Sequence, residues 1–188
     1  MTKTLKNNII TLPNILSFFR LLLIPCFVYT YTARNSSVET AAIILLSGIT
    51  DICDGYIARK FSMISDLGKI LDPVADKLTQ LFMMMCLLDR FPAMMLPLII
   101  LVFKEFTTGI FSFVVIKKTG LVMSADWHGK ACTALLYATM FLHIVWTRIP
   151  PTISICLIAI CAVLMAVSYI LYFARNVRAL SYPGKSAD

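Results

Sequence analysis

Four carboxylates lie between Asp51 and Asp76, within a sequence that is otherwise strongly apolar. Charged side chains are costly in apolar surroundings, so a set of this kind points to chemistry. On a helix, Asp51 and Asp54 share a face at positions i and i+3, and Asp72 and Asp76 share a face at i and i+4. The spacing therefore predicts two acidic helix faces. The small residues beside these acids are Gly55, Ala58 and Gly68.

A bound cation is the simplest way to keep these acids ionised, because like charges so close together repel one another in a low-dielectric site. No His or Cys lies at ligand spacing, and an all-carboxylate set favours a hard cation such as Mg²⁺ or Mn²⁺ over zinc. Arg59 adds a planar group that matches phosphate oxygens. The alternative is that these charges are caps, loop residues and surface residues. That alternative suits one or two of them better than the whole spaced set.

The stretch resembles the signature of the CDP-alcohol phosphotransferases, D-x2-D-G-x2-A-R-x8-G-x3-D-x3-D, and every fixed position is filled. The resemblance implies an integral membrane enzyme that transfers a substituted phosphate from a CDP-linked donor, such as CDP-diacylglycerol, to a small alcohol acceptor and releases CMP. It implies two divalent cations, Mg²⁺ or Mn²⁺, with Asp76 also serving as the proton acceptor. The implied metal ligands are Asp51, Asp54, Asp72 and Asp76.

The resemblance extends to the first apolar run, where Pro13 to Ser17, followed by Arg20, looks like the family's Pro-Asn-x-Leu-Ser/Thr-x-x-Arg segment. In the family this segment contributes to the pocket for the CDP-linked donor. On the bare sequence, Asn14 and Ser17 could equally be helix caps. The donor-binding residues that the resemblance implies are Asn14, Ile15, Leu16, Ser17, Gly55, Ala58, Arg59, Ser65 and Gly68.

Hydrophobic residues make up 59% of the 188, which indicates that the lipid bilayer is the solvent. We expect a single all-α domain over residues 1–188, with about six membrane spans and a short interfacial helix over residues 1–12. No cleavable signal peptide is expected, so the first span should remain in the protein. The spans run approximately from Pro13 to Tyr31, Val38 to Ile57, Ile70 to Leu88, Pro92 to Ile116, Ala131 to Trp146 and Ile153 to Phe173.

Lysine and arginine gather on one side of this arrangement, in the N-terminus, the second and fourth loops and the C-terminus. The positive-inside rule therefore predicts that both termini face the cytoplasm, and that the acidic site of this multi-pass protein opens at the cytoplasmic face of the cell membrane. The net charge of +7 suits anionic lipid headgroups, and not nucleic acid, because no basic run is interleaved with aromatic residues.

The acceptor is harder to predict. Asp126 to Thr133 looks like the Gly-Lys-x-Lys-Thr segment of the phosphatidylglycerophosphate-synthase branch, but Cys132 replaces the second Lys. That branch also usually carries Arg-Glu where this chain has Lys104 and Glu105. We expect glycerol 3-phosphate as acceptor, with phosphatidylglycerol, serine and an inositol phosphate as alternatives. Lysines that could bind an anionic acceptor, or simply anchor the chain at the membrane surface, are Lys104, Lys117, Lys118 and Lys130.

Two other classes of protein also bury acidic residues in a membrane. Membrane prenyltransferases hold a metal-bound diphosphate, but generally need more spans and two well-separated acidic segments. A small cation carrier or channel could bind its transported ion through the same aspartates. The resemblance favours the transferase and also implies a homodimer.

Overall fold

The computed structural model describes residues 11–61, 68–119 and 127–181. Within these ranges the chain is helical, with short turns and no strand, so the predicted all-α fold is confirmed. Each run predicted to be a span lies on one helix, except that residues 92–116 begin with a 3-10 turn and that Trp146, the predicted end of the fifth span, lies one residue beyond its helix. The elements are α1 (Leu12–Thr32), α2 (Ser37–Lys60), α3 (Gly68–Leu88), η1 (Pro92–Met94), α4 (Met95–Thr119), α5 (Trp127–Val145) and α6 (Pro151–Ser181).

Four helical segments of the described chain are long and apolar enough to cross a membrane, judged by length and composition. The apolar part of α5, Gly129–Val145, is shorter. α3 is long enough but carries Asp72, Asp76 and Lys77 within its length. Six spans therefore remain a prediction, as does the interfacial helix, of which residues 1–10 lie outside the described part. The four segments are Leu12–Thr32, Ser37–Ile57, Pro92–Val115 and Pro151–Val177.

The described residues form two compact units, each of which has its own helices. The first unit comprises the described residues of Met1–Asp89 together with Ile144–Thr147, and so contains α1, α2 and α3. The second comprises those of Arg90–His143 and Arg148–Asp188, with η1, α4, most of α5 and α6.

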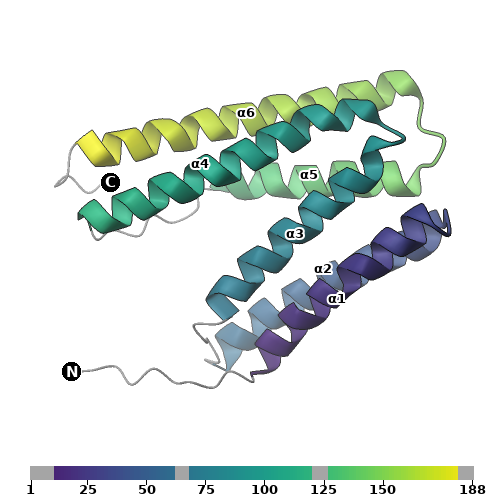
Figure 1. Cartoon of the computed structure of the whole chain (residues 1–188), viewed down its shortest axis with the longest axis horizontal. Coiled ribbons are helices and arrows are strands. Elements are labelled where there is room, and N and C mark those ends of the chain that lie inside the picture. The colour runs from purple at the N-terminus through teal and green to yellow at the C-terminus, as the bar shows by residue number, and fades with distance from the viewer. Residues whose placement is uncertain (1–10, 62–67, 120–126, 182–188) are drawn as a thin grey trace. The chain divides into compact units, whose positions relative to one another are not determined.

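In the first unit, α1 and α2 form a helical hairpin, and α3 packs along α1 (Figure 1). Asn35 in the connecting turn has a φ of 48°, a conformation that Asn adopts more readily than most residues. The Ser36 side chain caps α2 by accepting a hydrogen bond from the amide of Glu39. The hydroxyls of Thr30 and Thr40 lie 3.0 Å apart and join the two helices near this turn. The hairpin leaves α1 in contact with both helices that carry the aspartates.

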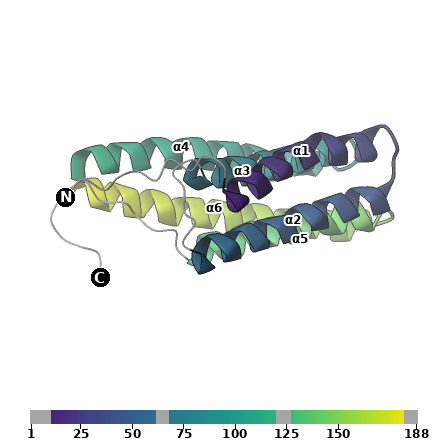
Figure 2. The same cartoon turned by 90° about the horizontal axis from the view of Figure 1, so that it is seen from below.

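In the second unit, α4 and α6 run side by side (Figures 1 and 2). His143 at the end of α5 is fully buried, and its Nε2 atom lies 3.0 Å from the hydroxyl of Ser154 on α6. Its Nδ1 atom lies 2.7 Å from the carbonyl oxygen of Thr139, and Phe91 packs edge-on against the imidazole ring. These contacts join α5 to the first turn of α6.

Large apolar side chains are exposed along the outer faces of the long helices. Val102, Phe106 and Phe113 on α4 are more than half exposed, and so are Val163 and Ile170 on α6. So many exposed large apolar side chains are unusual on a protein surrounded by water and suit contact with lipid. The exposed faces therefore agree with the composition in indicating a membrane protein.

Candidate active site

The first turns of α1 place three polar side chains on one buried stripe. Thr11 caps the helix by accepting a hydrogen bond from the amide of Asn14, and Pro13 occupies the first turn, where a missing N–H does no harm. Asn14, Ser17 and Arg20 then recur at every third position, and all three are buried. The cap is thus Thr11, so the interpretation of Asn14 and Ser17 as helix caps is wrong. Their side chains belong to the interior of the first unit.

Arg20 joins α1 to both aspartates of α2. Its Nη2 atom lies 2.7 Å from Asp51 Oδ1 and 2.5 Å from Asp54 Oδ2. Arg20 and Asp54 are almost completely buried, whereas the side chain of Asp51 is 51% exposed. One guanidinium therefore bridges two carboxylates that share a helix face, and it offsets part of the cost of removing Asp54 from water.

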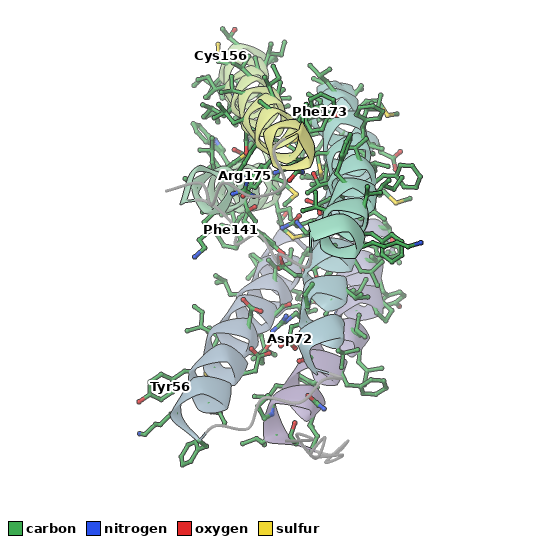
Figure 3. The ribbon with its side chains drawn as sticks, turned by 90° about the vertical axis from the view of Figure 1, so that its left-hand side faces the viewer. Tyr56, Asp72, Phe141, Cys156, Phe173 and Arg175 are labelled. Atoms are coloured by element: carbon green, nitrogen blue, oxygen red, sulfur yellow. The ribbon has the colours of Figure 1, made fainter. Side chains whose placement is uncertain are left out.

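Ser17 joins α1 to α3. Its hydroxyl donates a hydrogen bond to Asp72 Oδ1 and also lies 3.0 Å from the carbonyl oxygen of Pro13. Figure 3 shows Asp72 among the three helices of the first unit. Because Ser17 and Arg20 are one turn apart on α1, this single helix face contacts the acidic faces of both α2 and α3. The two halves of the acidic signature are brought together by a segment that lies far from them in the sequence.

Asp76 lies one turn after Asp72 and is half-buried. Its charge and that of Asp72 both act on Asp51, and Asp72 also acts on Asp54. Asp51 is thus close enough to both aspartates of α3 to be affected by their charges. Such crowding of like charges favours the binding of cations.

The residues fit a hard divalent cation by the chemistry of their donors. Carboxylate oxygens are the ligands that Mg²⁺ and Mn²⁺ prefer, and the four carboxylates lie in the first unit on two helices that both contact α1. The described residues contain no group of three or more His, Cys, Asp or Glu side chains close enough to surround one ion. Asp51 and Asp54 point to Arg20 instead, and Asp72 accepts from Ser17. A cation at the aspartates of α2 would therefore share these two carboxylates with the guanidinium of Arg20.

The residues predicted to contact the donor fall into three groups. Asn14 and Ser17 lie on the buried stripe of α1, whereas Ile15 is 51% exposed and Leu16 is half-buried. Gly55 is half-buried on α2, and Gly68 is buried at the start of α3. Three predictions lie outside what the structure describes: the side chains of Ala58 and Arg59, and the whole of Ser65.

The lysines predicted to bind the acceptor belong to the second unit. Lys104 on α4 is buried, with its Nζ atom 5.7 Å from the centre of the Tyr172 ring. The guanidinium of Arg175 lies 4.9 Å from the same ring, and Figure 3 shows Arg175 on α6. Lys117 and Lys130 are exposed, and the side chain of Lys118 is outside the described part. Lys104 is therefore the one described lysine of this set that is enclosed by protein.

Sequence reasoning missed two residues. Gln80 on α3 is fully buried, and neither polar atom of its amide has a hydrogen-bond partner within the described residues. It lies one turn after Asp76, and a polar residue at that spacing in an apolar run is a signal that could have found it. Tyr172 carried no such signal, because a tyrosine in an apolar helix is ordinary.

A sequence profile of the CDP-alcohol phosphatidyltransferase family matches residues 10–174. The chain belongs to this family. The match runs through the described parts of α1 to α5 and most of α6, and so includes all four aspartates and the polar stripe of α1. Members of the CDP-alcohol phosphatidyltransferase family generally depend on divalent cations, and family membership together with the apolar helices identifies a multi-pass membrane protein.

Two curated relatives of this chain differ in the reaction that they are named for. The chain is 33% identical over 116 residues to the CDP-diacylglycerol–glycerol-3-phosphate 3-phosphatidyltransferase of Rickettsia felis. The aligned residues cover 60% of this chain and 64% of the relative. The chain is 44% identical over 88 residues to a cardiolipin synthase (CMP-forming) and mitochondrial hydrolase fusion protein of Schizosaccharomyces pombe, which is 47% of this chain and 15% of that protein. The chain thus spans less than two thirds of the length of these relatives.

Proposed function

We propose that this chain transfers a phosphatidyl group from CDP-diacylglycerol to an alcohol, with glycerol 3-phosphate as the first candidate acceptor, and releases CMP. The observation that carries the proposal is the contact of one face of α1 with both acidic helices, through Arg20 with Asp51 and Asp54 and through Ser17 with Asp72. These contacts link three of the four aspartates of the signature to one helix face, which supports a shared site.

In the proposed reaction, Asp76 accepts the proton of the acceptor hydroxyl while the oxygen of that hydroxyl attacks the phosphorus nearer the lipid. A new P–O bond forms to the acceptor, the P–O bond to the CMP phosphate breaks, and CMP leaves with the bridging oxygen and its electron pair. Two divalent cations, held by Asp51, Asp54, Asp72 and Asp76, would supply charge stabilisation at the diphosphate. The protein needs a base and accurate positioning, but no nucleophilic Ser or Cys.

The proposed donor pocket combines the stripe of α1 with the small residues of the signature. Asn14 and Ser17 offer polar atoms from the buried side of α1, and Gly55 and Gly68 allow a bulky polar group to approach the backbone. Arg59 and Ser65 are proposed to bind the CDP portion on the basis of the family resemblance alone.

For the acceptor, the proposal assigns an anionic group to Lys104, with Lys117, Lys118 and Lys130 as further candidates. Lys104 is favoured because it is buried beside the face of Tyr172, in surroundings that a lone cation would otherwise avoid. Replacing Lys104 by Gln should raise the acceptor KM several-fold with little change in the donor KM. A change confined to the donor would contradict this assignment.

A cardiolipin synthase activity is the second candidate, and the similarity to the Schizosaccharomyces pombe protein favours it. Two features of the chain also weaken the first candidate. Cys132, which replaces the expected second lysine, is buried, and Lys104 stands where an arginine is usual. In the cardiolipin synthase reaction, the acceptor would be the glycerol hydroxyl of phosphatidylglycerol, with the same donor and the same four aspartates.

Incubation of the purified protein with CDP-diacylglycerol and one alcohol at a time tests the proposal. Glycerol 3-phosphate, phosphatidylglycerol, serine and an inositol phosphate are the alcohols to compare, with the lipid product identified by mass spectrometry. Phosphatidylglycerophosphate is the expected product. Release of no CMP with any alcohol, combined with cation flux through liposomes that contain the protein, would support a cation transporter instead.

The proposal also places the protein in the cell membrane as a homodimer, with both termini and the acidic site facing the cytoplasm. The distribution of Lys and Arg supports this orientation. A reporter fused after Asp188 that is active only in the cytoplasm should be active. An inactive fusion, together with activity of a periplasmic reporter at the same position, would show the opposite orientation.

A further inference from the structure

We infer that Arg20 and a divalent cation compete for Asp51 and Asp54, and that the displaced guanidinium binds phosphate oxygens of the donor, so that cation binding and donor binding favour each other. This inference rests on the proposed function and concerns the regulation of the same site.

Arg20 already occupies one oxygen of each of the two carboxylates that a cation would bind on α2. Its Nη2 atom lies within 2.7 Å of an oxygen of Asp51 and 2.5 Å of an oxygen of Asp54. A guanidinium and a divalent ion repel each other, and both seek the same carboxylate oxygens. Occupation of these oxygens by one of them therefore weakens binding of the other.

Arg20 also has N–H donors that its contacts with the two aspartates do not use. Its side chain is 2% exposed, and its Nε and Nη1 atoms have no hydrogen-bond partner within the described residues. Buried N–H groups without partners are costly, most of all on a charged group. A phosphate group near the aspartates would satisfy these donors, and arginine is well suited to binding phosphate through several parallel hydrogen bonds.

The shared carboxylates and the unused N–H donors of Arg20 together couple cation binding to donor binding. A cation that takes the place of Arg20 at Asp51 and Asp54 leaves the guanidinium without its carboxylates, and a diphosphate supplies replacement oxygens. By thermodynamic linkage, the donor must then increase the affinity for the cation by the same factor that the cation increases the affinity for the donor. Arg20 would thus prevent strong binding of either partner alone.

Binding of Mn²⁺ to the purified chain in detergent can be measured through the electron paramagnetic resonance signal of free Mn²⁺. This measurement tests the competition without measuring activity. Arg20→Gln should bind Mn²⁺ roughly tenfold more tightly than the wild type when no donor is present, within the usual range of coupling between ligands. Arg34→Gln is the matched control, because Arg34 forms an exposed ion pair with Glu39, with a distance of 2.7 Å. This control should bind Mn²⁺ as the wild type does.

Addition of CDP-diacylglycerol tests the coupling. The donor should tighten Mn²⁺ binding in the wild type and do so much less in Arg20→Gln. Arg20→Lys keeps the positive charge and serves if Arg20→Gln fails to fold. Because lysine lacks the planar fork of arginine, this variant should bind Mn²⁺ more tightly than the wild type and couple to the donor less. Mn²⁺ affinity that is unchanged or weaker in the folded Arg20 variants would overturn the inference.

The result separates this inference from the proposed function. If the wild type releases CMP from CDP-diacylglycerol but the Arg20 variants show unchanged Mn²⁺ affinity, only the competition is refuted. If the Arg20 variants bind Mn²⁺ more tightly but the wild type releases no CMP with any alcohol, the proposed function is refuted and the competition stands.

Discussion

The Nη2 atom of Arg20 on α1 lies 2.5 Å from Oδ2 of Asp54 on α2, and both side chains are almost completely buried. Each of the two charges would be costly to bury alone. Removing one partner of a buried ion pair typically costs about 3–5 kcal/mol, because the other charge remains unpaired. The stability of the first unit should therefore depend on this pair.

Replacing Arg20 by Met should lower the free energy of unfolding by about 3–5 kcal/mol when no divalent cation is present. The double variant Arg20→Met with Asp54→Asn should be more stable than Arg20→Met alone, because the buried carboxylate charge is removed as well. Thermal unfolding in detergent measures both effects. Additive losses in the double variant would show that the pair does not stabilise the fold.

Replacing Ser17 by Ala should weaken the positioning of Asp72, because the hydroxyl that donates to its carboxylate is lost. A hydrogen bond to a charged group is worth roughly 1.5–3 kcal/mol, so we expect activity to fall by about tenfold or more. Ser17→Thr keeps the hydroxyl and is the matched control. Equal activity of the Ala and Thr variants, measured as CMP release over a range of Mn²⁺ concentrations, would contradict a role for this contact.

Replacing Asp76 by Asn should nearly abolish CMP release while largely sparing donor binding. A positioned general base typically contributes about 10²–10⁴ in rate, which sets the expected loss in kcat. Binding of CDP-diacylglycerol, measured by calorimetry, should remain within a few-fold of the wild type. Turnover close to that of the wild type would remove Asp76 from the role of base.

Replacing Gly129 by Ala should disturb the second unit, because a Cβ atom at this position would lie 2.9 Å from Cε2 and 3.0 Å from Cζ of Tyr172. Tyr172 also contacts Lys104 and Arg175 through its ring face. Forced overpacking costs roughly 1–3 kcal/mol, so the variant should unfold at a lower temperature.

Gly109 on α4 is the matched control for this substitution, because a Cβ atom there would meet nothing within 4 Å. Gly109→Ala should leave the unfolding temperature unchanged or raise it slightly, since alanine favours a helix by about 1 kcal/mol over glycine. If Gly129→Ala is as stable as Gly109→Ala, the close approach of Tyr172 to Gly129 is not a constraint on this unit.

The sequence predicted the helices well, because long apolar runs leave few alternatives to a helix in a membrane. The 3.6-residue period also predicted which acids share a helix face, namely Asp51 with Asp54 and Asp72 with Asp76. The period alone could not show that Ser17 and Arg20 contact those two faces, although the resemblance of the first apolar run places this segment at the donor pocket. Such contacts depend on how α1 packs against α2 and α3, and spacing along one helix carries no information about its neighbours.

The polar residues of α1 show that side-chain preferences for helix caps do not decide which residue is the cap. Asn14 and Ser17 have the side chains of helix caps, but the cap is Thr11, and the other two lie further along the helix. Gln80 was missed for a related reason. A single amide in an apolar run has no partner in the sequence pattern, and its importance follows only from its complete burial without a hydrogen bond.

The most direct test of the central claim is CMP release from CDP-diacylglycerol and glycerol 3-phosphate as a function of Mn²⁺ concentration. The comparison is between the purified wild type and four variants in which Asp51, Asp54, Asp72 or Asp76 is replaced by Asn. One shared cation-dependent site predicts that the wild type releases CMP only with the cation, and that each variant loses at least about 100-fold in kcat. CMP release by the wild type without any divalent cation, or near-normal release by any one of the four variants, would contradict it.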